Sequence, residues 1–312
     1  MPPLEHLKVY IAGHTGLVGS ALCKRLSRLE GVELIKAARS ELDLTDSRAV
    51  ENFFQRTRPD IIIVAAGKVG GILANSLYPA EFIYENLAIE TNLIHCSWKV
   101  GVRRLLNFGS ACIYPKHCRQ PMSPDALMTG RMEPTSEPYA IAKLAGLSLC
   151  LSYNRQYGTS YITAIPCNLY GPGDSFDPAS AHVVPALINK FFKARMDKTD
   201  KVTLWGDGSA ARELLYVEDL AGACELLLRC YEGPEPINVG SGEAHTLREI
   251  AGLVAEVVGF RGEICWDSSG PEGAREKLLD SSELRALGWL SPMDLRAGLE
   301  QTFRWFLENW RS

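Results

Sequence analysis

The 312-residue sequence lacks any run of apolar residues that approaches the roughly 18 needed to cross a lipid bilayer. It also lacks an excess of basic residues, because 33 lysines and arginines stand against 37 aspartates and glutamates and leave a formal net charge of −4. This balance excludes the basic stripe that is typical of nucleic-acid-binding proteins. Low-complexity and collagen-like segments are missing as well, and 46% hydrophobic with 22% charged residues indicates an ordinary globular protein.

Signs of a metal or disulfide framework are missing too. The nine cysteines are scattered and odd in number, and no two of them have CxxC spacing. We therefore expect reduced thiols, no zinc or other metal site, and no disulfide framework. The N-terminus is polar and leads directly into a strand-like run, so we expect no signal peptide and a soluble protein of the cytoplasm.

Strand-like and helix-like segments alternate through the first half of the chain. Short apolar runs predict strands over 7–12, 32–37, 60–66, 104–108 and 160–165, and amphipathic patterns predict helices over 17–29, 47–56, 79–100 and 139–157. Continuous apolar strands that alternate with helices indicate a parallel sheet covered on both faces. Right-handed crossovers then give an α/β fold with a doubly wound, Rossmann-type sheet.

After about residue 170 the rhythm changes. Helices are predicted over 185–196, 218–231, 246–258 and 294–310, with short strands over 202–205, 237–239 and 263–266. We expect a smaller C-terminal α/β lobe packed against the carboxyl ends of the sheet. The predicted domains are residues 1–170, with returning segments around 212–242, and mainly residues 171–312.

A glycine-rich loop follows the first predicted strand and opens directly into a helix. Glycines in a GxxGxxG pattern permit a tight turn and let backbone N–H groups approach a pyrophosphate at the positive end of the helix. The strand–loop–helix context therefore predicts a dinucleotide site. It would be formed by Gly13, Thr15, Gly16, Leu17, Val18 and Gly19.

The end of the second predicted strand indicates which dinucleotide is preferred. An acidic residue about 20 positions after the loop would hydrogen-bond the ribose of NAD. Arg39 stands there instead, with Lys36 nearby and Glu41 beyond the strand end. A guanidinium can bind a 2′-phosphate through two hydrogen bonds, so NADP(H) is predicted over NAD. The alternative for Arg39 is a solvated surface side chain.

A tyrosine and a lysine lie four residues apart in a predicted helix and therefore share one helix face. They are Tyr139 and Lys143. A nearby ammonium stabilises a phenolate, so we expect the pKa of Tyr139 to fall and its proton to exchange with a substrate oxygen. Ser110 closely follows a predicted strand, at the carboxyl end where ligands of parallel sheets bind.

Together these motifs resemble the extended short-chain dehydrogenase/reductase family over essentially the whole chain. Two segments are shared across that family, AGHTGLVGS at 12–20 and EPYAIAK at 137–143. Two others, KVGGI at 68–72 and GSACIYPK at 109–116, are typical of a much narrower group, and the segments 168–172 and 205–213 also match it. This group epimerises and reduces GDP-bound 4-keto-6-deoxy sugars.

The resemblance implies that Ser110, Tyr139 and Lys143 form a reductase triad, and that Cys112 and His182 are the base and acid of an epimerisation. The chemistry fits, because a C4 ketone acidifies the hydrogens at C3 and C5 and the resulting enolate oxygen needs hydrogen-bond donors. A thiolate and an imidazole have pKa values that are tunable to neutral pH. The alternatives are a small buried thiol for Cys112 and a helix-capping role for His182.

The resemblance also implies that residues 1–170 bind NADP(H) and that the second lobe binds the nucleotide sugar. Arg212 matches a position on the diphosphate, and Asn168 matches one that orients the sugar. The implied substrate-binding residues are Asn168, Val183, Leu187, Trp205, Arg212 and Lys277, and Lys143, Asn168 and His182 are also expected at the cofactor. For each of these residues the alternative is a purely structural role, such as that of an exposed arginine or a core tryptophan.

Several positions depart from the pattern of this group. Thr15 stands where relatives often have an arginine that helps hold the 2′-phosphate, so NADP specificity would depend on Arg39 and Lys36. Ala111 replaces a serine or threonine. Leu214 and Tyr216 replace a phenylalanine and a histidine. These two departures bear on the expected binding of the substrate and not on the reductase residues.

The implied function is an NADPH-dependent, bifunctional 3,5-epimerase and 4-reductase that converts GDP-4-keto-6-deoxy-D-mannose to GDP-L-fucose. The open alternatives are a sister enzyme for another GDP-4-keto sugar such as the precursor of GDP-L-colitose, an NAD-dependent nucleotide-sugar 4-epimerase or 4,6-dehydratase, and a non-catalytic NADP-sensing protein. Family members commonly pair two long helices into a homodimer, and the helices over 79–100 and 139–157 have wide apolar arcs. We expect such a homodimer and no nucleic-acid or membrane partner.

Overall fold

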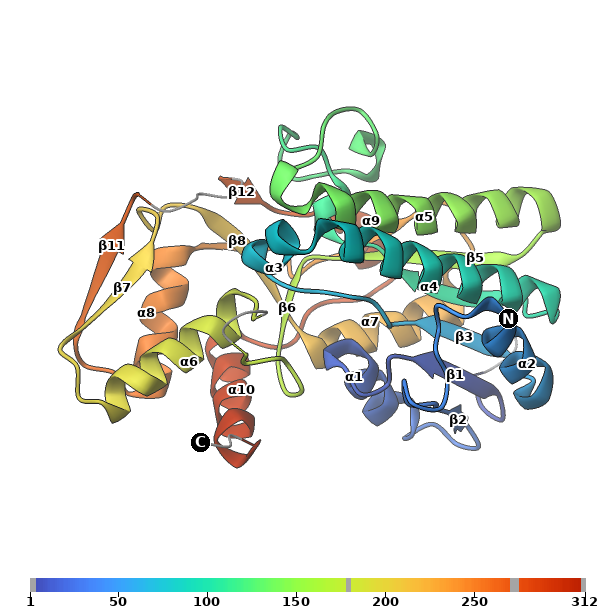
Figure 1. The fold of residues 1–312 in the computed structure, drawn as a ribbon, viewed down its shortest axis with the longest axis horizontal. Helices are drawn as coiled ribbons and strands as arrows, with labels where there is room; N and C mark the ends of the chain where they lie inside the picture. The colour runs from blue at the N-terminus through green and yellow to red at the C-terminus, as the bar shows by residue number, and fades with distance from the viewer. Residues whose placement is uncertain (1–3, 178–180, 270–274, 310–312) are drawn as a thin grey trace.

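The computed structural model describes residues 4–177, 181–269 and 275–309. Its main sheet has six parallel strands in the order β2-β1-β3-β4-β5-β9 (Figure 1). The strands are β1 (Lys8–Ala12), β2 (Glu33–Ile35), β3 (Ile61–Val64), β4 (Arg104–Phe108), β5 (Ser160–Pro166) and β9 (Ile237–Val239). All four residues of β3 are buried, as expected for a strand that is covered on both faces. The predicted α/β class and Rossmann-type sheet are confirmed.

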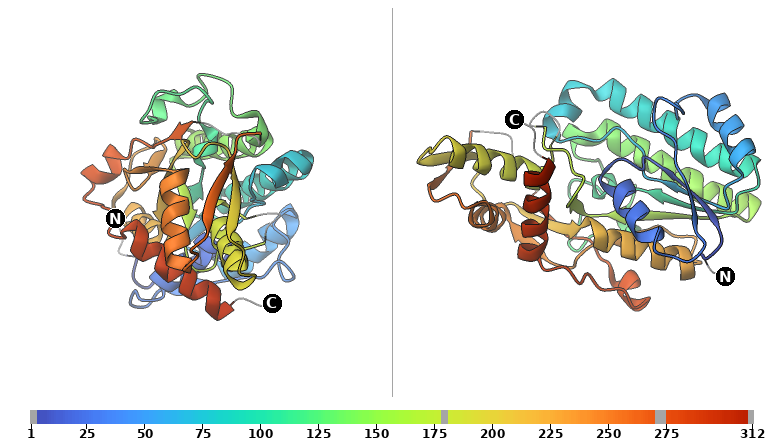
Figure 2. Two further views of the ribbon diagram at one scale, coloured as in Figure 1. Left: turned by 90° about the vertical axis from the view of Figure 1, so that its left-hand side faces the viewer. Right: turned by 90° about the horizontal axis from the view of Figure 1, so that it is seen from below.

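Helices cover both faces of this sheet. α2 (Ser47–Thr57) and α4 (Pro79–Lys99) enclose one apolar core, α1 (Leu17–Leu26) and α7 (Val217–Cys230) enclose the other, and α5 (Glu137–Tyr157) contributes residues to both. α4 and α5 run side by side along most of their lengths (Figures 1 and 2). This pair of long helices positions the residues that follow β3 and β4.

The strand order reverses around β1, which lies between β2 and β3. In doubly wound sheets the crevice beyond the carboxyl ends of the strands at such a reversal is where ligands bind. Gly13 follows β1 with a φ of +79°, and a Cβ there would lie 2.7 Å from the carbonyl oxygen of Ala65. Only glycine therefore allows the loop after β1 to lie against the loop after β3.

The chain leaves the main sheet at Cys167, whose backbone N–H donates to the carbonyl of Val239. β6 (Asn168–Tyr170) pairs with β8 (Ala211–Tyr216), which also pairs with β10 (Ala244–Thr246) and β12 (Glu276–Lys277). A second core forms around these strands. Its other elements are the two-stranded sheet of β7 (Lys201–Trp205) and β11 (Glu263–Asp267) and the helices α6 (Val183–Met196), α8 (Leu247–Val258) and α10 (Leu295–Asn309).

The chain returns to the main sheet with α7 and β9, whereas residues 212–216 lie in β8 of the second sheet. α5 begins two residues before its predicted start, because Pro138 suits the first turn of a helix. The predicted end of the last helix at residue 310 lies outside the described residues. The short elements are α3 (Ile72–Leu77), α9 (Ser282–Ala286) and the 3₁₀ turns η1 (Ala111–Ile113), η2 (Pro124–Ala126) and η3 (Pro134–Ser136). In the described ranges, no helix combines the length and apolarity needed to cross a membrane.

Candidate active site

The structure brings Ser110, Cys112, Tyr139 and Lys143 together. Ser110 caps η1, and its hydroxyl oxygen accepts a hydrogen bond of 3.3 Å from the backbone N–H of Cys112. The Ser110 side chain also lies near enough to the phenol of Tyr139 to favour its ionised form slightly. Lys143 lies one turn further along α5, with Nζ 5.9 Å from the centre of the Tyr139 ring. The short turn after β4 and the first turns of α5 therefore form one polar cluster.

The predicted fall in the pKa of Tyr139 is wrong for this arrangement. Burial of the phenol raises the pKa of Tyr139, and the Lys143 ammonium lowers it by less than burial raises it. The sequence shows the spacing of the two groups but not how much water reaches them, and here loss of water has the larger effect. Tyr139 is consequently held as a neutral proton donor.

Lys143 has a partner that the sequence analysis missed. Its Nζ lies 2.5 Å from Oε1 of Glu90 in α4, and the side chains are only 5% and 1% exposed. Burial alone would lower the pKa of Lys143, but the Glu90 carboxylate and the neighbouring Tyr139 outweigh burial and raise it. Lys143 is therefore a charged ammonium in spite of its burial.

The loop after β3 connects this cluster to the start of α6. A Cβ on Gly67 would lie 3.9 Å from Nζ of Lys143, and a Cβ on Gly71 would lie 3.0 Å from the carbonyl oxygen of Ala181. The loop thus lies close to Lys143 at one end and to the residue before His182 at the other. Asn86 of α4 fixes it, since its side-chain amide accepts from the N–H and donates to the C=O of Lys68 at 3.0 Å each.

His182 stands at the N-cap position of α6, but its side chain makes no capping hydrogen bond. The imidazole therefore does not cap α6. Part of the His182 side chain is exposed to solvent, but the protein packed around the rest removes some of its water. This partial desolvation lowers the pKa of His182. Neutral imidazole is then the main form at neutral pH.

The turn after β1 has the geometry of an anion cradle. The N–H of Gly16 donates to the carbonyl of Gly13 at 3.0 Å, and a Cβ on Gly19 would lie 2.1 Å from that same carbonyl oxygen. No acidic residue occupies the first turn of α1, so nothing opposes a negative charge there. Leu17 and Val18 are half-buried and Thr15 is exposed. These residues fit a dinucleotide pyrophosphate.

Arg39 lies just beyond β2 with 84% of its side chain exposed, and its Nη2 is 3.7 Å from Oε2 of Glu85. The nearby Glu41 is used within its own loop, because its Oε2 accepts a 2.7 Å hydrogen bond from the N–H of Ala38. No carboxylate at this strand end is thus placed as a ribose acceptor among the described contacts. The arrangement fits a 2′-phosphate better than a free ribose hydroxyl.

Residues predicted to bind substrate come from both sides of the second sheet. Arg212 and Lys277 are direct neighbours in the register of β8 and β12. Arg212 lies within electrostatic range of Cys112, so β8 of the second lobe comes near the catalytic cluster. Asn168 is half-buried at the start of β6, and Trp205 is 62% exposed at the end of β7.

Two predicted substrate residues lie on α6. Val183, the first residue of this helix, is half-buried, whereas Leu187 is 8% exposed and packs within the second core. Lys190 follows on the same helix, and its Nζ donates to the carbonyl of Thr203 at 2.6 Å. This cation was missed by the sequence analysis, and it lies beside the strand that ends at Trp205.

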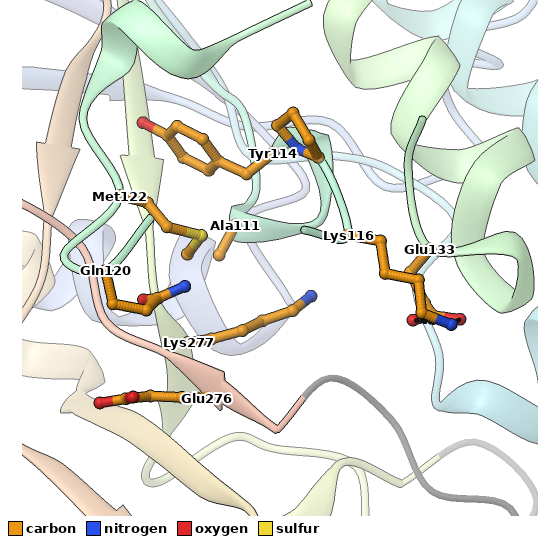
Figure 3. A pocket seen from close by; sticks show the side chains of 9 residues that line it. Ala111, Tyr114, Lys116, Gln120, Met122, Glu133, Glu276 and Lys277 are labelled. Atoms are coloured by element: carbon orange, nitrogen blue, oxygen red, sulfur yellow. Dashed lines mark hydrogen bonds and ion pairs between the residues drawn. The ribbon is translucent and has the colours of Figure 1, made fainter. Parts of the chain in front are cut away.

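A small pocket lies between η1 and β12 (Figure 3). Lys116 and Glu133 lie on one side, with Nζ and Oε2 separated by 3.3 Å, and Ala111 lies above. Lys277 extends across the pocket toward this ion pair (Figure 3). A cation of the second lobe therefore reaches the turn that carries Cys112.

Comparisons with known proteins agree with this geometry. The family model for the NAD dependent epimerase/dehydratase family matches residues 9–240. The chain is 49% identical to GDP-L-fucose synthase of Escherichia coli K12, over 97% of both chains, and 49% identical to GDP-L-fucose synthase 1 of Arabidopsis thaliana, over 97% of this chain and 94% of that protein. A crystal structure of a GDP-L-fucose synthetase from Naegleria fowleri bound to NADP matches with a TM-score of 0.91 and 26% identity, over 99% of this chain and 95% of that chain. The chain belongs to the NAD dependent epimerase/dehydratase family, within which these relatives are GDP-L-fucose synthases.

Proposed function

We propose that this chain is an NADPH-dependent enzyme that converts GDP-4-keto-6-deoxy-D-mannose to GDP-L-fucose by 3,5-epimerisation and 4-reduction. The observation that carries the proposal is the convergence of Ser110, Cys112, Tyr139 and Lys143 beside a dinucleotide cradle, with Arg212 of the second lobe within electrostatic range of Cys112. The near 50% identity to GDP-L-fucose synthases over almost the whole chain supports the choice of substrate.

In the reductase step, NADPH, when bound, supplies a hydride to C4 of the sugar. Tyr139 gives its proton to the ketone oxygen, and Ser110 donates a second hydrogen bond to that oxygen. The Lys143 ammonium stabilises the phenolate that Tyr139 becomes. The raised pKa of Tyr139 suits this role, because the tyrosine remains protonated until the alkoxide forms.

In the epimerase step, Cys112 removes a proton from C3 or C5 and His182 returns one to the opposite face. Ser110 and Tyr139 hydrogen-bond to the enolate oxygen, so one oxyanion site serves both reactions. The two epimerase residues come from different lobes, since Cys112 lies in η1 and His182 directly precedes α6.

The two ligands would be held by separate sets of residues. The turn from Gly13 to Gly19 would bind the pyrophosphate of NADPH, and Arg39 its 2′-phosphate. Lys143, Asn168 and His182 would line its nicotinamide end. Arg212 and Lys277 would bind the diphosphate of the GDP-sugar, with Trp205 and Val183 at the nucleotide.

We also propose that the chain acts as a homodimer through α4 and α5. Large apolar side chains are exposed on these helices, among them Tyr84 (67%), Ile141 (41%) and Tyr157 (40%), and α5 has no charged residue between Lys143 and Arg155. Such a face is typical of an interface. A mass of one chain in light scattering at micromolar concentration would contradict the dimer.

We propose that the protein is located in the cytoplasm, where a reduced thiol such as that of Cys112 persists.

The proposed function is tested by incubating the protein with GDP-4-keto-6-deoxy-D-mannose and NADPH in deuterated water and identifying the product by NMR. We expect GDP-L-fucose with deuterium at C3 and C5 and consumption of NADPH. Reduction without inversion or exchange would remove the epimerase, and turnover of a 3-deoxy sugar alone would indicate the sister enzyme. Purified protein that carries stoichiometric NAD would favour a 4-epimerase or dehydratase.

A further inference from the structure

A buried ion pair lies directly beneath the candidate catalytic cluster. Lys143 is 4% exposed and Glu90 is 1% exposed, and no other charged side chain makes an ion pair with either of them in the part of the chain that the structure describes. Removing an ammonium from water disfavours its charged form, so an isolated lysine at this depth would tend to lose its proton. Glu90 supplies the compensating charge: burial raises the pKa of Glu90, and the Lys143 ammonium opposes that rise, so each group of the pair favours the charged form of the other.

α5 is built to admit this carboxylate. A Cβ on Gly146 would lie 1.5 Å from Oε2 of Glu90 and 3.1 Å from Nδ2 of Asn107, so the glycine leaves the space that these atoms fill. Gly146 stands three residues after Lys143 and therefore on the same helix face. Lys143, which needs the carboxylate, and Gly146, which leaves room for it, therefore lie in the same turn of α5.

The surroundings give the pair no other charge. Asn107 of β4 and Thr163 of β5 are neutral and buried, and the thiol of Cys150 has its pKa raised to about 12 by burial. Tyr139 is the titratable neighbour on the catalytic side, and Cys112 lies beyond it. The charge on Lys143 therefore depends on Glu90 more than on any other described group.

We infer that Glu90 is a positioning residue for the proposed reductase: its buried carboxylate keeps the Lys143 ammonium charged and fixed beside Tyr139. This inference rests on the proposed function and assigns a role to a residue outside the triad. Glu90 acts through Lys143 alone, because its 1% exposure leaves it without access to either ligand.

The charge effect has a definite sign. In the wild type the pKa of Lys143 is raised, so the ammonium persists well into alkaline solution. With a neutral residue at position 90, only the smaller effect of Tyr139 opposes burial, and the pKa of Lys143 should fall below the usual value for lysine of about 10.4. Phenolate stabilisation and cofactor binding through Lys143 should then be lost at lower pH than in the wild type.

The test is the substitution Glu90→Gln, which keeps the shape and removes the charge. NADPH affinity and kcat for the keto sugar are measured between about pH 6 and pH 10, a range in which the wild-type ammonium should persist and the lysine of the variant should begin to lose its proton. We expect both alkaline limbs to move to lower pH by at least one unit, which is a loss of about tenfold at a fixed alkaline pH. Glu90→Asp keeps the charge and should restore the limb at least in part.

A matched control removes a different buried carboxylate. Asp219 of α7 is 6% exposed and accepts from Ser291 Oγ at 2.6 Å and from the N–H of Met293 at 3.0 Å, away from the catalytic cluster. Asp219→Asn should lower stability and leave the two pH profiles unchanged.

The inference is overturned if NADPH affinity and kcat of Glu90→Gln depend on pH as they do in the wild type, even if both are lower by the same factor at every pH. If Glu90→Gln does not fold, Gly146→Ala takes its place, because the added methyl group displaces the same carboxylate. A pH profile like that of the wild type in Gly146→Ala would also overturn the inference. A wild type that binds NADPH and leaves the sugar unchanged contradicts the proposed function instead. The pH dependence of NADPH affinity then still decides the role of Glu90.

Discussion

A single methyl group on α5 should disturb the catalytic cluster without touching any proposed catalytic side chain. In Gly146→Ala the new Cβ would stand 1.5 Å from Oε2 of Glu90. The carboxyl end of a glutamate can swing away, so the steric overlap is relieved, but the swing takes the carboxylate from Lys143. Leaving one member of a buried pair without its partner costs about 3–5 kcal/mol.

Against this stands the ordinary gain from replacing a helical glycine by alanine, about 0.5–1 kcal/mol. The net loss in unfolding free energy should be about 2–4 kcal/mol, or a fall in Tm of about 4–16 °C, since each kcal/mol is worth about 2–4 °C in large domains. The reductase kcat should fall as well, because Lys143 loses its fixed position.

Thermal unfolding followed by circular dichroism measures the first effect, and NADPH oxidation measures the second. Gly252→Ala is the matched control, because Gly252 also lies within a helix and a Cβ there meets nothing within 4 Å. That control should be neutral or slightly stabilised. If Gly146→Ala unfolds like Gly252→Ala and keeps its activity, the packing argument is refuted. In a Glu90→Ala background Gly146→Ala should cost little, because its collision partner is gone.

Three further predictions concern individual side chains. Cys112→Ser should slow deuterium exchange at C3 and C5 more than hydride transfer to C4, and equal losses in the two assays would remove Cys112 as the base. Arg39→Ala should weaken NADPH binding by about 1–3 kcal/mol, the value of a charged hydrogen bond, and NADH binding much less; equal weakening would exclude contact with the 2′-phosphate. Because crowding lowers the pKa of His182, its acid form is depleted as pH rises through a value below the usual 6.5 or so, and deuterium exchange should slow in the same direction. Exchange that accelerates with pH across that range in the Cys112→Ser variant as well would assign His182 as the base.

The sequence was sufficient for the parts of the fold that local patterns control. β3 lies within a run of β-branched residues, and the turn after β1 carries the glycines that its close contacts require. Tyr139 and Lys143 share a helix face because their spacing dictates it. Ser110 was placed at a strand's carboxyl end because a parallel sheet offers that position to every βα turn.

Features that depend on tertiary burial could not be predicted in the same way. The sign of the Tyr139 pKa depends on the competition between lost water and the Lys143 charge, and only the folded chain sets that balance. Asn86 and Glu90 stand four residues apart in α4 with only apolar residues between them, and this spacing was a usable signal for polar groups directed at one site. Gly146 carried no signal of its own, because its purpose is visible only when Glu90 is in place.

The division of labour between the two cores follows from where each residue is anchored. Ser110, Cys112, Tyr139 and Lys143 belong to the turn after β4 and to α5, so the main sheet and its helices position the proposed reductase triad. His182 is anchored instead at the start of α6, whose apolar side packs in the second core. Both steps need the second lobe to hold the GDP-sugar, and epimerisation additionally needs His182 to keep its position relative to Cys112. The loop after β3, close to Lys143 at one end and to Ala181 at the other, is the element that couples the two cores.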